Sequence, residues 1–165
     1  MLLFPIQPCL LPDEALLGRY SSNGSYTDCY MTEIPIPVSQ AQYVNAFYTT
    51  PLFKLERFIL TWTVSKPSTD IQAKQLADGT RDAFAAWTVE AWTENQLLMC
   101  DFLSRTRSWL MVLPLESGTR LYFGSAIVSK TGKSTLELGF RALLGFHRLY
   151  SVALLHAARS RLENL

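Results

Sequence analysis

The stretch Leu138–Leu162, LGFRALLGFHRLYSVALLHAARSRL, decides the fold because it is long, rich in apolar residues and free of proline. It predicts a single helix of several turns. The segment before it predicts a meander of strands joined by short polar turns, at residues 84–93, 97–104, 105–113 and 119–128. An antiparallel sheet followed by one long helix is typical of a two-layer α+β sandwich, often with a cavity between the layers.

The first half of the chain predicts an arm, one strand and two or three short helices. Residues 1–25 are interpreted as an extended N-terminal arm, and residues 26–165 as a single domain. Tyr26–Ile34 has strand composition and ends at a pair of prolines. The helices are expected at residues 41–48 after an N-cap at Ser39, at 52–63 with one apolar face, and from a cap at Asp70 to Ala77, with Gly79 as a left-handed exit.

Composition narrows the classes of function. Charged residues make up 18% of the chain and the net charge is +1, so we expect no nucleic-acid partner. The three cysteines are scattered without a metal-binding spacing, which favours reduced thiols and a cytoplasmic protein with neither metal nor cofactor. Prolines interrupt the apolar N-terminus, so it predicts neither a secretory signal nor a membrane span.

Two short motifs resemble known catalytic patterns without completing them. Gly132-Lys133-Ser134 ends like a phosphate-binding loop, but Ile127 occupies the position of the required first glycine. Gly124-Ser125-Ala126 lacks the flanking glycines of a nucleophile elbow and lies within a predicted strand. The first motif therefore does not predict nucleotide binding, and the second does not predict a nucleophilic serine.

His147 is the strongest candidate for acid–base chemistry. It lies nine residues from His156 on the same predicted helix, so the two rings face opposite ways and cannot share a metal. His147 shares a stripe with Ser151 and Leu154, where it serves either as a general base or as a hydrogen-bonded core histidine. Asp28 is the second catalytic candidate.

The candidate ligand-binding residues are aromatic or basic. Arg105, Arg107 and Trp109 alternate onto one strand face, where two guanidinium groups beside an indole could bind a carboxylate. An exposed cross-strand ion pair is the alternative. The other candidates are Tyr26, Tyr30, Trp87 and Tyr150.

Both faces of the predicted sheet contain apolar residues. Trp87 and Val89 alternate with Thr88, Glu90 and Trp92, so a second surface must be buried as well. A homodimer contact and coverage by the N-terminal arm remain alternative explanations.

Several separated pieces together resemble an uncharacterised bacterial family of the START or birch-pollen-allergen-like type, also called SRPBCC or helix-grip. The pieces are Leu11-Pro12 with Ala15–Leu17, Tyr26–Tyr30, the Pro51 helix, Ser104–Val112 and Gly145–Tyr150. The central strand departs from the family pattern: Ser104, Thr106 and Ser108 replace Asp, His and Asp, while Arg105 is kept. The resemblance implies a curved antiparallel sheet with the C-terminal helix on its concave face and a cavity between them.

The sequence therefore predicts a protein that binds a hydrophobic small molecule between sheet and helix. One alternative is a polyketide-type cyclase or isomerase that uses the same cavity, because such chemistry needs only cavity shape and one acid or base. Another is a dimeric interaction protein without enzymatic activity. The sequence does not decide whether the protein is an enzyme.

Overall fold

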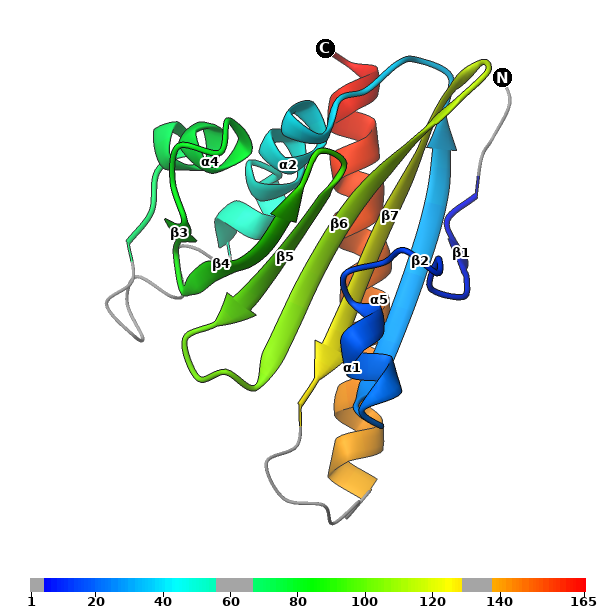
Figure 1. Cartoon of the computed structure of the whole chain (residues 1–165), viewed down its shortest axis with the longest axis vertical. Helices are drawn as coiled ribbons and strands as arrows, with labels where there is room; N and C mark the ends of the chain where they lie inside the picture. Colours follow the sequence, from blue (N-terminus) through cyan, green and yellow to red (C-terminus); the bar gives the residue numbers. More distant parts are fainter. Residues whose placement is uncertain (1–4, 56–66, 129–137) are drawn as a thin grey trace.

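Seven antiparallel strands form one sheet in the order β1-β2-β7-β6-β5-β4-β3, and the long helix α5 lies across one face (Figure 1). The computed structural model describes residues 5–55, 67–128 and 138–165, and for 138–146 the backbone alone. The strands are β1 Gln7–Pro8, β2 Tyr26–Ile34, β3 Ala83–Phe84, β4 Trp87–Thr93, β5 Gln96–Asp101, β6 Thr106–Leu115 and β7 Gly118–Ile127. The helices are α1 Gly18–Ser22, α2 Gln40–Tyr48, α4 Asp70–Ala77 and α5 Leu138–Glu163. The expected α+β class, antiparallel sheet and packed C-terminal helix are confirmed.

The face of the sheet that carries α2 and α5, here called the inner face, holds the larger core. Aromatic side chains fill the space below α2, and the most deeply buried are Tyr43, Phe47, Tyr48, Phe53 and Phe84. Several pack edge to face, with ring centroids of Phe47 and Tyr48 5.2 Å apart. The predicted cap of α2 is confirmed, because Ser39 and Gln42 form a reciprocal capping box.

The opposite, outer face is covered by the N-terminal residues, which the sequence predicted to be an extended arm. In Figure 1, α1 lies in front of the sheet, on the side away from α5, and β1 lies beside β2. β1 pairs with β2 at the sheet edge, and Leu17 is fully buried in a second core with Trp109 and Tyr122. The second apolar surface is therefore buried within the chain itself, whereas the homodimer stays a prediction.

Two strand boundaries differ from the expected ones. The segment 84–93 is divided into β3 and β4, because Ala85 adopts a positive φ of 53° and turns the chain back. Between β5 and β6, Ser104 has a φ of 56° and the Asp101 carboxylate accepts hydrogen bonds from the backbone of Arg105 and Thr106 at 2.7 and 2.9 Å. An aspartate thus makes a turn that has neither glycine nor proline.

One prediction about the short helices, the N-cap of α4, is wrong. The N-cap of α4 is Thr69, not Asp70, and it forms a capping box with Gln72. Threonine accepts the backbone N–H of Gln72, while Asp70 is the first helical residue and pairs with Lys54 at 2.6 Å. Gly79 has the expected left-handed φ of 71°. Much of the predicted helix 52–63 and the Gly132-Lys133-Ser134 motif lie outside the described residues.

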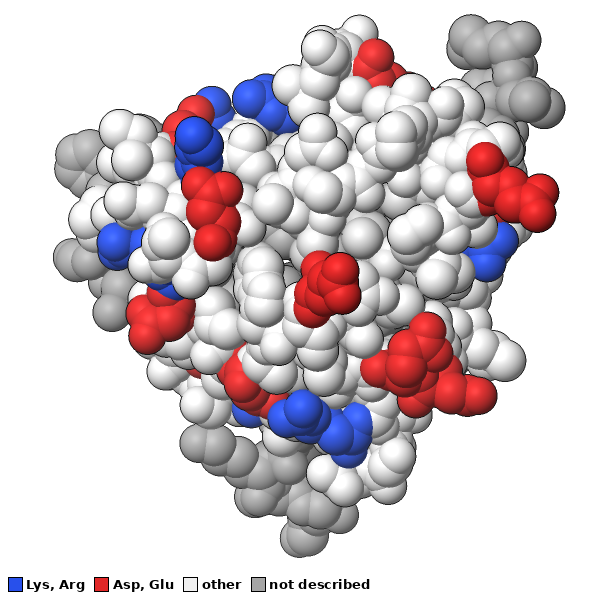
Figure 2. Space-filling view, turned by 45° about the horizontal axis from the view of Figure 1, so that its top comes forward, with Lys and Arg blue, Asp and Glu red and all other residues white. Residues whose placement is uncertain are grey.

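Among the described residues, no helix is both long and apolar enough to cross a membrane. Within the same ranges, no three side chains from His, Cys, Asp and Glu gather as metal ligands. On the face shown in Figure 2, acidic and basic residues are dispersed among uncharged ones.

Candidate functional site

Asp28, Ser125 and His147 meet on the inner face, where β2 and β7 run beneath α5. Asp28 lies directly opposite Ser125 in the ladder between β2 and β7. The Ser125 hydroxyl is 2.6 Å from Asp28 Oδ1 and 2.6 Å from His147 Nε2. The Ser125 backbone N–H also donates to Asp28 Oδ1, at 3.1 Å. The two catalytic candidates are therefore bridged by a serine that the sequence did not assign to the site.

The hydrogen bonds fix the direction in which protons point when Asp28 is ionised. Serine has a single hydroxyl proton, and that proton is donated to Asp28 Oδ1. His147 Nε2 must then carry the proton that it donates to the Ser125 oxygen. In the neutral ring the free lone pair is left on Nδ1, which has no hydrogen-bond partner among the described residues. His147 is thus set up to accept a proton at Nδ1.

The carboxylate of Asp28 is not fully paired. Its side chain is 9% exposed, and the buried Oδ2 oxygen has no hydrogen-bond partner in the part of the chain that the structure describes. His147 Nε2 lies 3.5 Å from this oxygen. A buried polar atom without a partner costs roughly 1–3 kcal/mol, so such atoms are expected at functional sites.

This arrangement differs from that of a serine hydrolase. A nucleophilic serine donates its proton to the histidine, and the carboxylate holds the far nitrogen of the ring. Here the carboxylate holds Ser125 itself and approaches the same ring nitrogen as Ser125 does. The serine is a bridge between acid and base, which agrees with its position inside a strand.

Aromatic hydroxyl groups lie beside this trio. Tyr26 and Tyr30 flank Asp28 on the same face of β2 because side chains alternate along a strand. Burial, assisted by the charge of Asp28, raises the pKa of Tyr30 to about 12, so its phenol stays protonated and able to donate. Arg148 donates to the Tyr26 hydroxyl at 3.4 Å, and that contact raises the pKa of the guanidinium.

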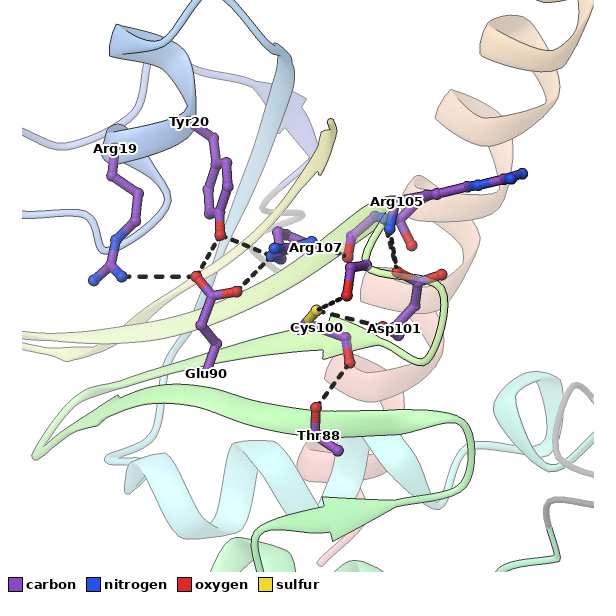
Figure 3. A network of polar contacts seen from close by, with 10 residues as sticks. Arg19, Tyr20, Thr88, Glu90, Cys100, Asp101, Arg105 and Arg107 are labelled. Carbon is purple, nitrogen blue, oxygen red and sulfur yellow. Dashed lines mark hydrogen bonds and ion pairs between the residues drawn. The ribbon is translucent and has the colours of Figure 1, made fainter. Parts of the chain in front are cut away.

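Arg107, one of the two basic candidates, lies on the outer face, away from this trio. Arg107 Nε donates to Glu90 Oε2 at 2.5 Å and to the Tyr20 hydroxyl at 2.8 Å, and Tyr20 also donates to Glu90. Arg19 approaches the same carboxylate at 3.6 Å. Figure 3 shows Glu90 between α1 and the sheet, contacted by Arg19, Tyr20 and Arg107. Through these contacts the N-terminal segment binds to β4 and β6.

The structure also separates the other candidates. Trp109 is fully buried on the outer face, and its indole N–H donates to Gln96 at 2.9 Å. Arg105 is exposed at the turn between β5 and β6 (Figure 3). Trp87 and Tyr150 pack against the inner core, from β4 and α5 respectively. Of the predicted site residues, Asp28, His147, Tyr26 and Tyr30 gather in one place.

Ser125 and Arg148 join the site without having been predicted as parts of it. Ser125 faces Asp28 only because β2 pairs with β7, which is 97 residues away along the chain. No local signal in the sequence marks that pairing. Arg148 follows His147 in a helix whose orientation depends on packing.

Two open pockets lie elsewhere on the surface. One, of about 570 Å³, lies between the end of α4 and β4 and includes Arg81, Val89 and Trp92 in its lining. The other, of about 520 Å³, lies at the end of α5 and includes His156 and Leu165. Neither is lined by Asp28, Ser125 or His147.

Comparison with solved structures gives a likeness to a known protein. No protein-family model matches the chain, and no curated protein matches it. Among solved structures, the chain is similar to CalU16 from Micromonospora echinospora, with 12% sequence identity and a TM-score of 0.35. The likeness covers 98% of this chain and 94% of CalU16. The family resemblance seen in the sequence stays a prediction.

Proposed function

We propose that this protein binds a hydrophobic small molecule that also carries a hydrogen-bond donor, next to Asp28, Ser125 and His147 on the inner face. The observation that carries the proposal is the buried Asp28 Oδ2, which has no partner among the described residues. A hydroxyl, enol or amine of a ligand would supply the missing donor, if a small local movement admitted it.

Two further features support a ligand site beside Asp28, Ser125 and His147. The His147 side chain is 30% exposed, so the trio is reached from outside the core. Tyr30 and Phe123 lie two residues along their strands from Asp28 and Ser125, and both are largely buried. They would offer an apolar wall beside the polar end of the site.

Native mass spectrometry and thermal shift with lipid, polyketide and terpenoid panels test the proposal. We expect at least one class to bind the wild type, and Asp28→Asn and His147→Gln to weaken that binding about tenfold or more. His156→Gln is the matched control, because His156 is an exposed histidine on the same helix. The absence of any binding, or equal binding by His147→Gln and His156→Gln, would contradict the proposal.

A second candidate function is proton transfer on such a ligand, as in a cyclase or isomerase. The specific observation in its favour is the hydrogen-bonded path from Asp28 through Ser125 to His147, which leaves Nδ1 as the free base. A positioned base of this kind typically accelerates proton abstraction by about 10²–10⁴-fold. The ligand would need an acidic C–H next to a carbonyl.

Deuterium exchange into a β-diketone probe in D₂O separates catalysis from binding alone. Catalysis predicts exchange above the buffer rate in the wild type and in His156→Gln, with a fall to the buffer rate in His147→Gln. Binding of the probe without accelerated exchange would leave the binding function and reject the enzyme.

A further inference from the structure

Cys9 and Cys29 face each other where the N-terminal segment pairs with the sheet. The ladder of β1 with β2 joins Gln7 to Met31 and Pro8 to Tyr30, so its next step sets Cys9 opposite Cys29. The Cys9 N–H donates to the Cys29 carbonyl at 3.0 Å, and the two sulfur atoms are 3.1 Å apart.

This geometry meets the requirements of a disulfide. Residues directly opposite in an antiparallel pair have Cα atoms about 4.5–5.5 Å apart, within the range of about 4.4–6.8 Å that disulfides bridge. The sulfur atoms would need to approach by about 1 Å to reach bonding distance. No rearrangement of the strands is needed.

We infer that Cys9 and Cys29 form a thiol–disulfide modification site that closes reversibly and ties the N-terminal segment to β2. All three cysteines are free in this structure, so it represents the reduced form. The inference does not depend on the proposed ligand site, because it concerns the attachment of the N-terminal segment at the sheet edge.

The two thiols differ in reactivity. The hydrogen bond between the sulfur atoms lowers the pKa of Cys9 and raises that of Cys29. The positive charge of Arg120 also lowers the pKa of Cys9, while burial opposes it. Cys9 is partly exposed and Cys29 is buried. Cys9 is therefore the attacking thiolate, and Cys29 is the second thiol.

A hydroperoxide is the oxidant class that suits this pair. The Cys9 thiolate attacks one peroxide oxygen, an S–O bond forms, the O–O bond breaks and the leaving oxygen takes up a proton. Cys29 sulfur then attacks the sulfenic acid, an S–S bond forms, and the S–O bond breaks. The hydroxide leaves with the Cys29 proton as water. The two thiols lose two electrons, and the peroxide is reduced.

Peptide mapping tests the inference, because Arg19 is the only lysine or arginine between the two cysteines. Trypsin under non-reducing conditions would leave residues 1–19 joined to 20–54 only through the disulfide. We expect this linked pair after treating the folded protein with hydrogen peroxide, and its loss on adding dithiothreitol.

Variants and melting temperature complete the test. Cys100→Ser should keep the linked peptides, whereas Cys9→Ser, at the partly exposed position, should abolish them. Because the disulfide closes a loop of 20 residues, oxidation should raise the melting temperature by about 5–10 °C, and dithiothreitol should reverse the rise. Oxidation that leaves the two peptides separate, or that joins either cysteine to Cys100 instead, would overturn the inference.

Discussion

Glu90 and Glu33 both pair with arginine on strands of the sheet, yet water reaches the two pairs differently. The Arg107 and Glu90 side chains are 11% and 21% exposed, whereas those of Arg120 and Glu33 are 30% and 29% exposed. Removing one partner from a shielded pair leaves a poorly solvated charge behind. An exposed pair contributes little because water replaces the lost partner.

The first prediction follows from that difference. Glu90→Gln should lower the free energy of unfolding by about 1–3 kcal/mol, because the neutral amide leaves one acceptor oxygen where Arg107 and Tyr20 each use an oxygen of the carboxylate. Glu33→Gln is the matched control and should cost about 1 kcal/mol or less. Urea unfolding measures both. Equal losses would show that the Glu90 cluster does not hold the N-terminal segment.

The second prediction concerns alkaline pH. The pKa of Tyr30 is raised from 10.0 to about 12, so the folded state keeps a proton that the unfolded chain loses. The contribution of Tyr30 is complete below pH 10.0 and falls as the pH rises towards 12. Tyr30→Phe, which cannot ionise, should flatten the decline of unfolding free energy in this range. An unchanged slope would contradict the assignment.

At the level of elements, Gly124 is a point of close approach between β7 and Leu17 of the N-terminal segment. A Cβ at this position would lie 2.9 Å from the Asp28 carbonyl oxygen, from Leu17 and from Trp109. Two of these neighbours are fully buried side chains and the third is backbone, so none can move away easily.

Gly124→Ala should therefore lower the free energy of unfolding by about 1–3 kcal/mol, because the added methyl group overpacks this core. Gly18→Ala is the matched control, because a Cβ at Gly18 would meet no atom within 4 Å. Alanine also favours the helix there, so that variant should be neutral or slightly more stable. Denaturant unfolding compares the two. An unchanged free energy of unfolding in Gly124→Ala would contradict the prediction, because it would mean that the neighbouring side chains move to make room for the methyl group.

At the scale of the whole molecule, the N-terminal residues complete the second core. Leu17 is fully buried against a sheet face that also buries Trp109, Leu98 and Met111. Without this cover, the same face would present an apolar surface to solvent, and such surfaces associate.

Deleting residues 1–22 should therefore produce self-association together with a lower melting temperature. Size-exclusion chromatography with light scattering measures the mass of the full chain and of the deletion. A deletion variant with the mass of the full chain and unchanged stability would contradict the prediction. The mass of the full chain also tests the homodimer predicted as an alternative.

Sequence patterns that span only a few residues were sufficient to predict several features of the fold. The Ser39 cap, the left-handed Gly79 and the long C-terminal helix depend on residues close together in sequence, and all are present. Hairpin partners were predictable because short connections force neighbouring strands to pair. The split at Ala85 was not, because a left-handed alanine has no sequence signature.

The sequence by itself determined the class of fold, since helix and strand periods, caps and short turns act over a few residues. It also marked Asp28 and His147 as the side chains to examine. Only the tertiary structure brought them together through Ser125 and moved Arg107 and Trp109 to the opposite face. The reason is that pairing of β2 with β7, and the choice of face for each strand, depend on contacts between residues far apart in the chain.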